Sequence, residues 1–337
     1  MTTEAEMSTF AAVISASILS FLLTGAATWY ARRRGLLDHP GERHSHQIAT
    51  PRGGGAGLVA SLLIVTLLLI HSPPAFWAIC IAPAAFMMAA TGWWDDHKSL
   101  SARLRFSIQL AVSFYLIWCA ADSGWLQGAL TMLIACLLVV WMTNLYNFMD
   151  GSNGMAGLQG VYAACVLAWL FHIAGDEAFS TISILLAACC VGFLPWNLGR
   201  ARVFMGDAGS LALGFIFSAL LLYGVGTGAF GLPVVLMLML VFLTDSTLTL
   251  LSRIMKREQW YTAHRQHLYQ RLIACGWTHG RVALVYQAIN LTLVFPGIVI
   301  AINFPALAWP VTLFLVVVVV LGWYLINNKL GVLARAG

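Results

Sequence analysis

Two adjacent carboxylates, Asp95 and Asp96, stand at the end of an apolar stretch in the segment TGWWDDHKSL, with Lys98 two residues further on. Adjacent positions cannot share one helix face, so the pair suits a helix end, with one carboxylate facing a site and the other a neighbour or a metal. Mg2+ takes one or two carboxylates plus substrate phosphates, and Lys98 could hold such a phosphate. A solvated helix end would carry the same charges, so both interpretations stay open.

A second cluster, NFMDGSNGMAG, places Asn147, Asp150 and Asn153 three residues apart. On a helical turn this spacing stacks three oxygen-bearing side chains on one face. In a membrane protein such a face must look inward or toward water. The cluster therefore indicates either a ligand site or a strip of interhelical hydrogen bonds, which small and polar residues also form.

Two further segments, around Asp207 and around Arg52, resemble phosphate-binding turns, and a third contains the isolated carboxylate Asp245. In FMGDAGSLALG, Asp207 directly precedes an apolar helix, where it is either an ordinary cap or a metal ligand beside a phosphate on the free N–H groups. Asp245, in FLTDSTLTL, is an intramembrane carboxylate whose role the sequence leaves open. In TPRGGGAG, Arg52 leads into a glycine-rich turn that suits either a phosphate nest or a flexible start of a helix.

The segment AHRQHLYQR holds His264 and His267 three residues apart, with Arg265 and Arg271 close by. Two histidines are too few for a zinc site, which needs a third protein ligand. Arginine and histidine together suit the binding of an anionic substrate. An amphipathic helix at the membrane surface is the alternative interpretation.

The composition indicates that membrane helices must position these residues. Of the 337 residues, 60% are hydrophobic and only 9% are charged, whereas about a quarter of a soluble protein is charged. Long apolar stretches with short polar interruptions indicate an all-α polytopic membrane protein, and residues 1–337 are expected to form a single domain. The seven cysteines form no CxxC pair and no spaced framework, which argues against disulfides and a cysteine metal site.

We expect eleven membrane-spanning helices, since a span needs about twenty apolar residues. Their expected positions are 7–31, 54–70, 75–92, 106–121, 126–146, 157–174, 179–196, 209–225, 232–252, 283–302 and 308–326. With this count, all 18 Lys and Arg residues fall in loops or tails on one side. The positive-inside rule makes that side cytoplasmic and the N-terminus periplasmic. The polar clusters fall on the same side, so we expect an active site at the cytoplasmic face.

In their order along the chain, the motifs resemble those of the polyprenyl-phosphate N-acetylhexosamine-1-phosphate transferases of the MraY, WecA and TagO type. DDHKSL is similar to the DDxxK signature of this family, NFMDGSNGMAG to its N-x-x-DG segment and GDAGSLALG to its GD-x-GS segment. AHRQHLYQR is similar to its histidine-containing cytoplasmic loop. The sequences YNFMDG and HRQHLYQR look closest to those of members of the WbpL type, which start O-antigen synthesis.

The resemblance implies that undecaprenyl phosphate attacks the β-phosphorus of a UDP-N-acetylhexosamine, giving undecaprenyl-diphospho-sugar and UMP. It implies Mg2+ as cofactor, with Mn2+ a possible replacement, and a place in the bacterial inner membrane. Asp207 would ligate the metal, with Asn147 a possible second ligand. The expected catalytic group is Asp95, Asp96, Lys98 and Asp150, with the first two handling the lipid phosphate. The expected substrate-binding residues are Arg52, Asn153, His264, Arg265 and His267.

Two departures from the family pattern bear on the substrate. Asn153 stands where the family often has Asp, at a position linked to the uracil ring. The loop has the spacing HxxH rather than a run of three histidines, which argues against a muramyl-pentapeptide substrate. A GlcNAc nucleotide or a deoxy relative such as FucNAc or QuiNAc is expected instead. Membrane lipid is an expected partner, nucleic acid is not, and a homodimer is a possible assembly.

Three other classes compete with this interpretation. A secondary transporter could use Asp150, Asp207 and Asp245 as coupling sites, but transporters place such groups near the bilayer midplane and often show inverted repeats, which are absent here. A CDP-alcohol phosphotransferase would need an Arg after the DG pair, which DGSNGMAG lacks. A structural membrane protein without chemistry would not need Asp207 and Asn147 at one face.

Overall fold

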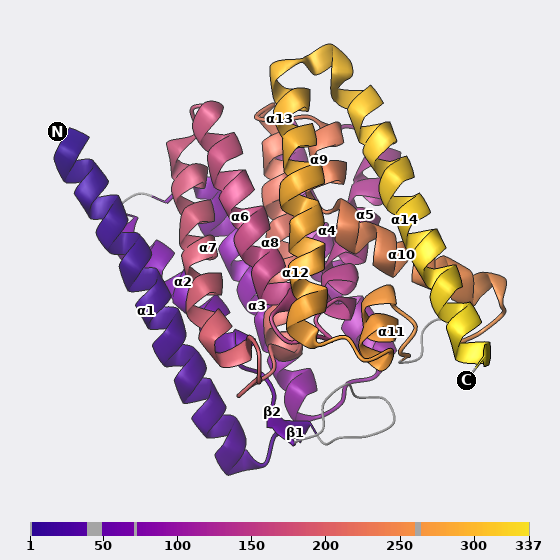
Figure 1. Cartoon of the computed structure of the whole chain (residues 1–337). Helices are drawn as coiled ribbons and strands as arrows, with labels where there is room; N and C mark the ends of the chain where they lie inside the picture. The colour runs from indigo at the N-terminus through magenta and orange to yellow at the C-terminus, as the bar shows by residue number, and fades with distance from the viewer. Residues whose placement is uncertain (1, 39–48, 71–72, 260–263, 337) are drawn as a thin grey trace.

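The computed structural model describes residues 2–38, 49–70, 73–259 and 264–336 and shows a bundle of helices (Figure 1). Its helices are α1 Thr2–Arg34, α2 Gly55–Leu69, α3 Ala82–His97, α4 Ala102–Asp122, α5 Ala129–Phe148, α6 Met155–Ile173, α7 Glu177–Asn197, α8 Gly206–Gly226, α9 Leu232–Leu238, α10 Leu240–Met255, α11 Leu268–Ala274, α12 His279–Ile289, α13 Phe295–Asn303 and α14 Ala308–Ala336. Short π-helical and 3-10 turns are η1 Phe76–Ile81, η2 Asn290–Val294 and η3 Pro305–Leu307. The expected all-α class is confirmed, apart from a two-residue antiparallel pairing of β1 Leu37–Asp38 with β2 Thr50–Pro51.

The number of spans differs from the eleven expected. Within the described part of the chain, nine helices are long and apolar enough to cross a membrane, and a bent pair raises the total to ten. The helix expected at 54–70 is α2, which has only 15 residues. At 1.5 Å per residue it is shorter than the hydrocarbon core of about 30 Å. Most of its described side chains are nevertheless buried, because it packs against α1, α3, α7 and α8, while Ile64, Leu67 and Leu68 are exposed.

The helix expected at 232–252 is wrong as a single element, because α9 and α10 meet at Met239 with a bend of 75°. Such a break leaves backbone groups without helical partners, which is costly away from water. The buried amide of Gln159 compensates in part, since its Nε2 donates to the carbonyl of Leu238 at 3.5 Å. Asn290 Nδ2 in turn donates to Gln159 Oε1 at 2.7 Å. The break is therefore built into a polar cluster inside the bundle.

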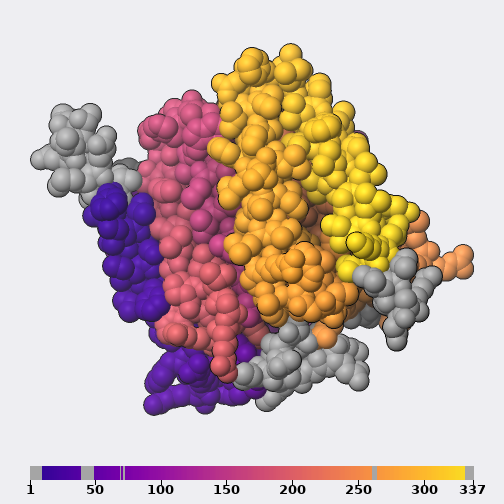
Figure 2. Space-filling view, in the orientation of Figure 1, coloured from indigo at the N-terminus to yellow at the C-terminus, as the bar shows by residue number. Residues whose placement is uncertain are grey.

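Helix α8 forms the centre of the bundle, because 83% of its apolar 18-residue stretch is buried. The corresponding buried share is 17% for α1 and 11% for the span that contains α14. The space-filling view shows α1 on one side of the molecule and α14 on the other (Figure 2). Helix α3 packs closely against the start of α8, and a Cβ at Gly92 would collide with the backbone of Asp207 and Ala208. Glycine at this position thus sets the separation of two elements that carry polar motifs.

Replacing Gly92 by Ala should therefore destabilise the protein. Overpacking a close contact typically costs about 1–3 kcal/mol, and the nearest atoms here are backbone that cannot swing away. The matched control is Gly322→Ala in α14, where a Cβ meets nothing within 4 Å. Thermal unfolding of the purified protein in detergent should show a lower Tm for Gly92→Ala and an equal or higher Tm for Gly322→Ala. Equal Tm values for Gly92→Ala and the wild type would contradict the packing argument.

Candidate functional site

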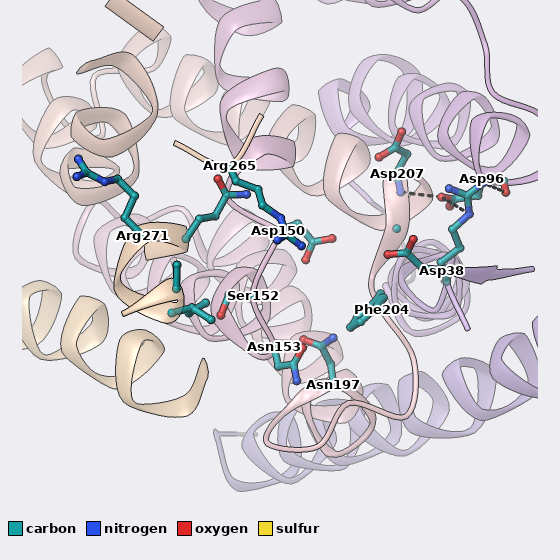
Figure 3. A pocket seen from close by; sticks show the side chains of 16 residues that line it. Asp38, Asp96, Asp150, Ser152, Asn153, Asn197, Phe204, Asp207, Arg265 and Arg271 are labelled. Atoms are coloured by element: carbon teal, nitrogen blue, oxygen red, sulfur yellow. Dashed lines mark hydrogen bonds and ion pairs between the residues drawn. The ribbon is translucent and has the colours of Figure 1, made fainter. Parts of the chain in front are cut away.

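At the end of the bundle where β1 and β2 lie, the last turn of α3 meets β1, Arg52 and the segments that follow α5, α7 and α10 (Figure 1). There they enclose a cavity of about 530 Å³ (Figure 3). Its charged lining comprises four carboxylates and three guanidinium groups, namely Asp38, Asp96, Asp150, Asp207, Arg52, Arg265 and Arg271. Polar motifs that are more than a hundred residues apart in the sequence thus share one hollow, as the pattern of span ends predicts.

Asp96 caps the start of α8. Its Oδ1 accepts the backbone N–H of Asp207 at 3.2 Å, and its Oδ2 accepts that of Ala208 at 3.2 Å. The first amides of a helix have no partner within the helix, and a carboxylate there also gains from the helix dipole. Gly206 has φ +72, and a Cβ on it would lie 2.7 Å from Asp96 Oδ2. Asp96 is 3% exposed, so its carboxylate chiefly holds α8 against α3.

Arg52 holds Asp96 from the other side. Its Nη2 donates to the Asp96 backbone carbonyl at 2.5 Å, and its Nε lies 3.9 Å from Asp96 Oδ1. Next to it, the glycine turn packs on the segment before α8, where the N–H of Gly54 donates to the carbonyl of Phe204 at 2.9 Å. The turn after Arg52 is therefore a structural join between α2 and α8.

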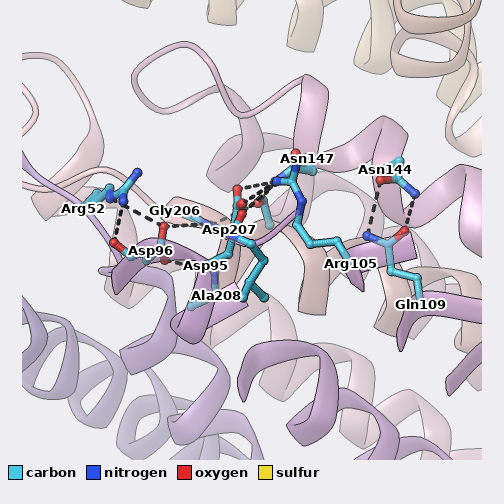
Figure 4. Close-up of polar contacts among 12 residues, drawn as sticks. Arg52, Asp95, Asp96, Arg105, Gln109, Asn144, Asn147, Gly206, Asp207 and Ala208 are labelled. Atoms are coloured by element: carbon cyan, nitrogen blue, oxygen red, sulfur yellow. Dashed lines mark hydrogen bonds and ion pairs between the residues drawn. The ribbon is translucent and has the colours of Figure 1, made fainter. Parts of the chain in front are cut away.

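Asp95 belongs to a different set of contacts (Figure 4). Its Oδ1 accepts the backbone N–H of Leu100 at 2.5 Å, and its Oδ2 accepts Arg105 Nη1 at 2.7 Å. The same Nη1 lies 3.4 Å from Asp207 Oδ2. Arg105 therefore bridges the carboxylates of α3 and α8. The sequence alone does not single out Arg105, because its partners are 10 and 102 residues away and no local spacing marks it.

Asp207 and Asn147 are in direct contact. Asn147 Nδ2 donates to Asp207 Oδ1 at 2.7 Å and to Ser210 Oγ at 2.8 Å. No group of three or more His, Cys, Asp or Glu side chains able to hold a metal occurs in the described ranges. A site with one carboxylate, an amide and remaining positions for phosphate and water suits Mg2+, which keeps several waters, better than a transition metal. The donor set therefore fits Mg2+ held mainly by Asp207.

Asp150 faces the same cavity from the turn after α5. Burial raises the pKa of Asp150 well above its ordinary value, and the negative charges of Asp207 and Asp96 raise it further. The N–H of Gly206 acts in the opposite direction. Three carboxylates in one cavity repel one another, so a cation there would lower the energy of the ionised state.

The turn that follows Asp150 is held by residues from two other loops. His279 Nδ1, at the start of α12, accepts the N–H of Asn153 at 3.3 Å and lies 3.1 Å from Ser152 Oγ. Asn153 Nδ2 donates to the carbonyl of Gly199 at 2.8 Å, while Asn197 Oδ1 accepts the N–H of Gly154 at 2.7 Å. Asn153 lines the cavity, and a backbone carbonyl orients its amide. The sequence alone does not single out Asn197 or His279, because neither lies in a recognisable motif.

The segment 264–274, which we call the basic wall, forms the side of the cavity that carries Arg265 and Arg271 (Figure 3). Burial lowers the pKa of His264 to about 4, with nearby His267 and Arg253 adding to the effect. Burial also lowers the pKa of His267, whose ring stacks on Phe148 at 6.1 Å between centroids. Both histidines are therefore neutral at pH 7, and the positive charge of the wall comes from its arginines.

The expected site residues thus divide into three groups. Six line the cavity, namely Arg52, Asp96, Asp150, Asn153, Asp207 and Arg265. Asp95 and Asn147 adjoin it, Asn147 by a direct bond to Asp207 and Asp95 through Arg105. The third group does not line the cavity: Lys98 is exposed just after α3, and of the two histidines of the basic wall His264 is half-buried and His267 is buried. Helix α3 ends at His97, so Lys98 follows it in extended backbone, with its side chain exposed.

Residues 77–225 match the model of the family described as Glycosyl transferase family 4. A Bacillus subtilis protein, "Probable undecaprenyl-phosphate N-acetylglucosaminyl 1-phosphate transferase", is 27% identical over 95% of this chain and 92% of its own length. The "Decaprenyl-phosphate N-acetylglucosaminephosphotransferase" of Mycobacterium tuberculosis is 27% identical over 81% of this chain and 77% of its own. A "Phospho-N-acetylmuramoyl-pentapeptide-transferase" of Synechococcus elongatus is 32% identical over 53% of this chain and 55% of its own.

The matched residues contain the Asp95–Asp96 pair, the Asn147–Asn153 turn and Asp207, so the likeness covers three of the four carboxylates that line the cavity, all but Asp38. The chain therefore belongs to glycosyl transferase family 4 and is a multi-pass membrane enzyme of the polyprenyl-phosphate HexNAc-1-phosphate transferase class.

Proposed function

We propose that this enzyme transfers HexNAc-1-phosphate from a UDP-N-acetylhexosamine without a peptide, GlcNAc or a deoxy relative, to undecaprenyl phosphate. The products are undecaprenyl-diphospho-HexNAc and UMP, in the first membrane step of O-antigen or similar surface polysaccharide synthesis. The observation that carries the proposal is the cavity in which Asp96, Asp150 and Asp207 face a wall bearing Arg265 and Arg271. The likeness also favours it, because the N-acetylglucosaminyl relatives cover 81–95% of the chain and the muramoyl-pentapeptide relative covers 53%.

The reaction brings one phosphate toward a diphosphate, so repulsion is its main obstacle. An oxygen of the lipid phosphate forms a bond to the β-phosphorus, and the bond from that phosphorus to the bridging oxygen of UMP breaks. The attacking phosphate has a pKa near 6 and is largely ionised at neutral pH, so no strong base is needed. Catalysis then depends on positioning and on neutralising charge, as in other phosphoryl transfers.

The residues divide this work between the two sides of the cavity. Arg265 and Arg271 would bind the diphosphate of the nucleotide, and Asn153, which lines the same cavity, would contact its base. Mg2+, when bound, would neutralise charge on the diphosphate, held by Asp207 with Asn147 orienting or joining it. Arg105, between Asp95 and Asp207, would offer positive charge to the lipid phosphate. Asp96 acts through its cap on α8, and Asp150 supplies a further acidic group.

The transporter alternative is not favoured by these contacts. Coupling carboxylates lie near the bilayer midplane and change partners during transport. Here Asp96 and Asp207 lie at the end of α3 and the start of α8, and Asp96 is committed to two helix amides.

We further propose that this end is cytoplasmic, because Arg32 at the end of α1 and the basic residues of the later loops lie there. The N-terminus would then be periplasmic, because α1 would cross the membrane once before Arg32.

The orientation can be checked by labelling with a membrane-impermeant maleimide in intact cells. In a background without native cysteines, a cysteine at Ser123, in the turn after α4, should react from outside. A cysteine at Arg200, in the loop between α7 and α8, should react only after the membrane is opened. The reverse pattern would overturn the proposed orientation.

The substrate class can be tested with purified protein, Mg2+, undecaprenyl phosphate and a panel of UDP-sugars. We expect UMP release with UDP-GlcNAc or with a deoxy relative such as UDP-FucNAc or UDP-QuiNAc. UDP-MurNAc-pentapeptide should be turned over at background level, because the histidine loop lacks the run of three histidines. Robust turnover of that nucleotide alone would show the assignment to be wrong.

The metal site can be tested by Asp207→Asn, which keeps the shape but removes one negative charge. UMP release should fall by about two to three orders of magnitude at low Mg2+, and part of it should return at high Mg2+ or with Mn2+. The matched control is Asp122→Asn, an exposed carboxylate at the far end of α4, which should behave as wild type. In addition, Mg2+ should raise the Tm of the wild type and not that of Asp207→Asn. A fully active Asp207→Asn at low Mg2+ would rule out this ligand assignment.

A further inference from the structure

Asp245 is a buried carboxylate that the proposed chemistry does not use. It lies in α10 and is 1% exposed, well away from the acidic residues of the cavity in sequence. The sequence leaves its role open, and an unpaired charge in such a place would be very costly. Its hydrogen bonds therefore show what the fold gains from keeping it.

Five donors surround the carboxylate of Asp245. Its Oδ1 accepts the backbone N–H of Leu268 at 2.7 Å, Trp323 Nε1 at 3.1 Å and Thr249 Oγ1 at 3.3 Å. Its Oδ2 accepts the hydroxyl of Tyr286 at 2.8 Å and the backbone N–H of Tyr269 at 3.3 Å. One side chain of α10 thereby ties together α11, α12 and α14. The two backbone amides belong to the first turn of α11, so Asp245 caps that helix.

The capped helix is part of the cavity itself. Gln270, Arg271, Ile273 and Ala274 of α11 line the cavity together with Arg265, just before the helix. Arg271 also donates through Nη1 to Asn327 Oδ1 of α14, one turn beyond Trp323. Because α11 has only seven residues, it has little helical stability of its own and depends on these contacts.

A second connection runs from α11 to the acidic side. Tyr269, whose amide reaches Asp245, donates its hydroxyl to the carbonyl of Phe148 at 3.0 Å. Phe148 ends α5, two residues before Asp150, and a Cβ on Gly151 would collide with the same hydroxyl. The position of α11 thus sets the distance between the basic wall and the turn that bears Asp150.

We propose that Asp245 is a positioning residue for binding of the nucleotide-sugar, acting by anchoring the basic wall across the cavity from Asp150 and Asp207. The inference rests on the proposed function for its substrate but not for its contacts. Asp245 does not touch the cavity and is not a catalytic residue. Its effect reaches the diphosphate through Arg265 and Arg271, whose backbone it holds in place.

Asp245→Asn tests this, because an amide can accept through one oxygen only and turns an NH2 group toward donors on the other side. KM for the UDP-HexNAc that the wild type uses should rise about tenfold, with a smaller change in kcat and in KM for undecaprenyl phosphate. Tyr269→Phe, which removes only the hydroxyl bond to Phe148, should raise the same KM to a lesser degree and serves if Asp245→Asn fails to fold.

The matched control is Asp176→Asn at the opposite end of the bundle. Asp176 also caps a helix and binds a tyrosine, accepting the N–H of Phe179 at 3.0 Å and the hydroxyl of Tyr223 at 2.7 Å. Its substitution should lower Tm but leave KM for the nucleotide unchanged. An equal rise in KM for the two variants, or no rise for Asp245→Asn and Tyr269→Phe, would overturn the proposal.

Hydrogen–deuterium exchange separates this inference from the proposed function, since it needs no substrate. In Asp245→Asn, amides of 264–274 should exchange faster while those of 176–183 stay protected, and Asp176→Asn should show the reverse. Unchanged protection of 264–274 would overturn the anchoring role even if the enzyme uses UDP-HexNAc. Faster exchange in a protein whose wild type neither binds UDP nor turns over any UDP-HexNAc would count against the proposed function instead, and leave the anchor established.

Discussion

The carboxylate of Asp96, bonded to the first amides of α8, joins the two helices on which the site is built. Helix α8 is the most buried long helix of the described bundle, so the direction of its N-terminus is set by the core and not by solvent. The cap and the close approach at Gly92 place Asp207 beside α3. Only in this arrangement can Arg105 bridge Asp95 and Asp207, and Asn147 of α5 reach the same carboxylate. The arrangement of Asp95, Asp96 and Asp207 therefore depends on the position of the N-terminus of α8.

Opposite charges on the two sides of the cavity explain why so apolar a chain concentrates its charged residues here. The acidic side suits a divalent cation, and the basic wall suits the diphosphate that would share it. The neutral histidines of the wall leave its charge to the arginines, whose planar groups bind phosphate in two-point contacts. Two anionic substrates can then meet with their repulsion reduced from both sides, which is the main requirement of transfer between phosphates.

Polar groups inside the bundle serve the same site from a distance. Gln159 supports the break between α9 and α10, which redirects α10 so that Asp245 can reach α11. Without water, each of these groups must find protein partners, and the partners come from several helices at once. Burying the carboxylate of Asp245 is costly, but the hydrogen bonds that this burial requires fix the position of the basic wall. The enzyme's cavity is open, but its two sides are held by interactions that water does not weaken.

Periodicity, composition and local motifs were enough to identify a helical membrane protein, most of its span positions and the clusters around Asp95, Asn147 and Asp207. These are properties of neighbouring residues, and span length is set by the bilayer. The break at Met239, the partners of Arg105 and the absence of Lys98 from the described cavity lining depend instead on contacts across the bundle. The same holds for Asp245, whose donors lie up to 78 residues away. Such pairings leave no period in the sequence, because packing between distant helices decides which side chains meet.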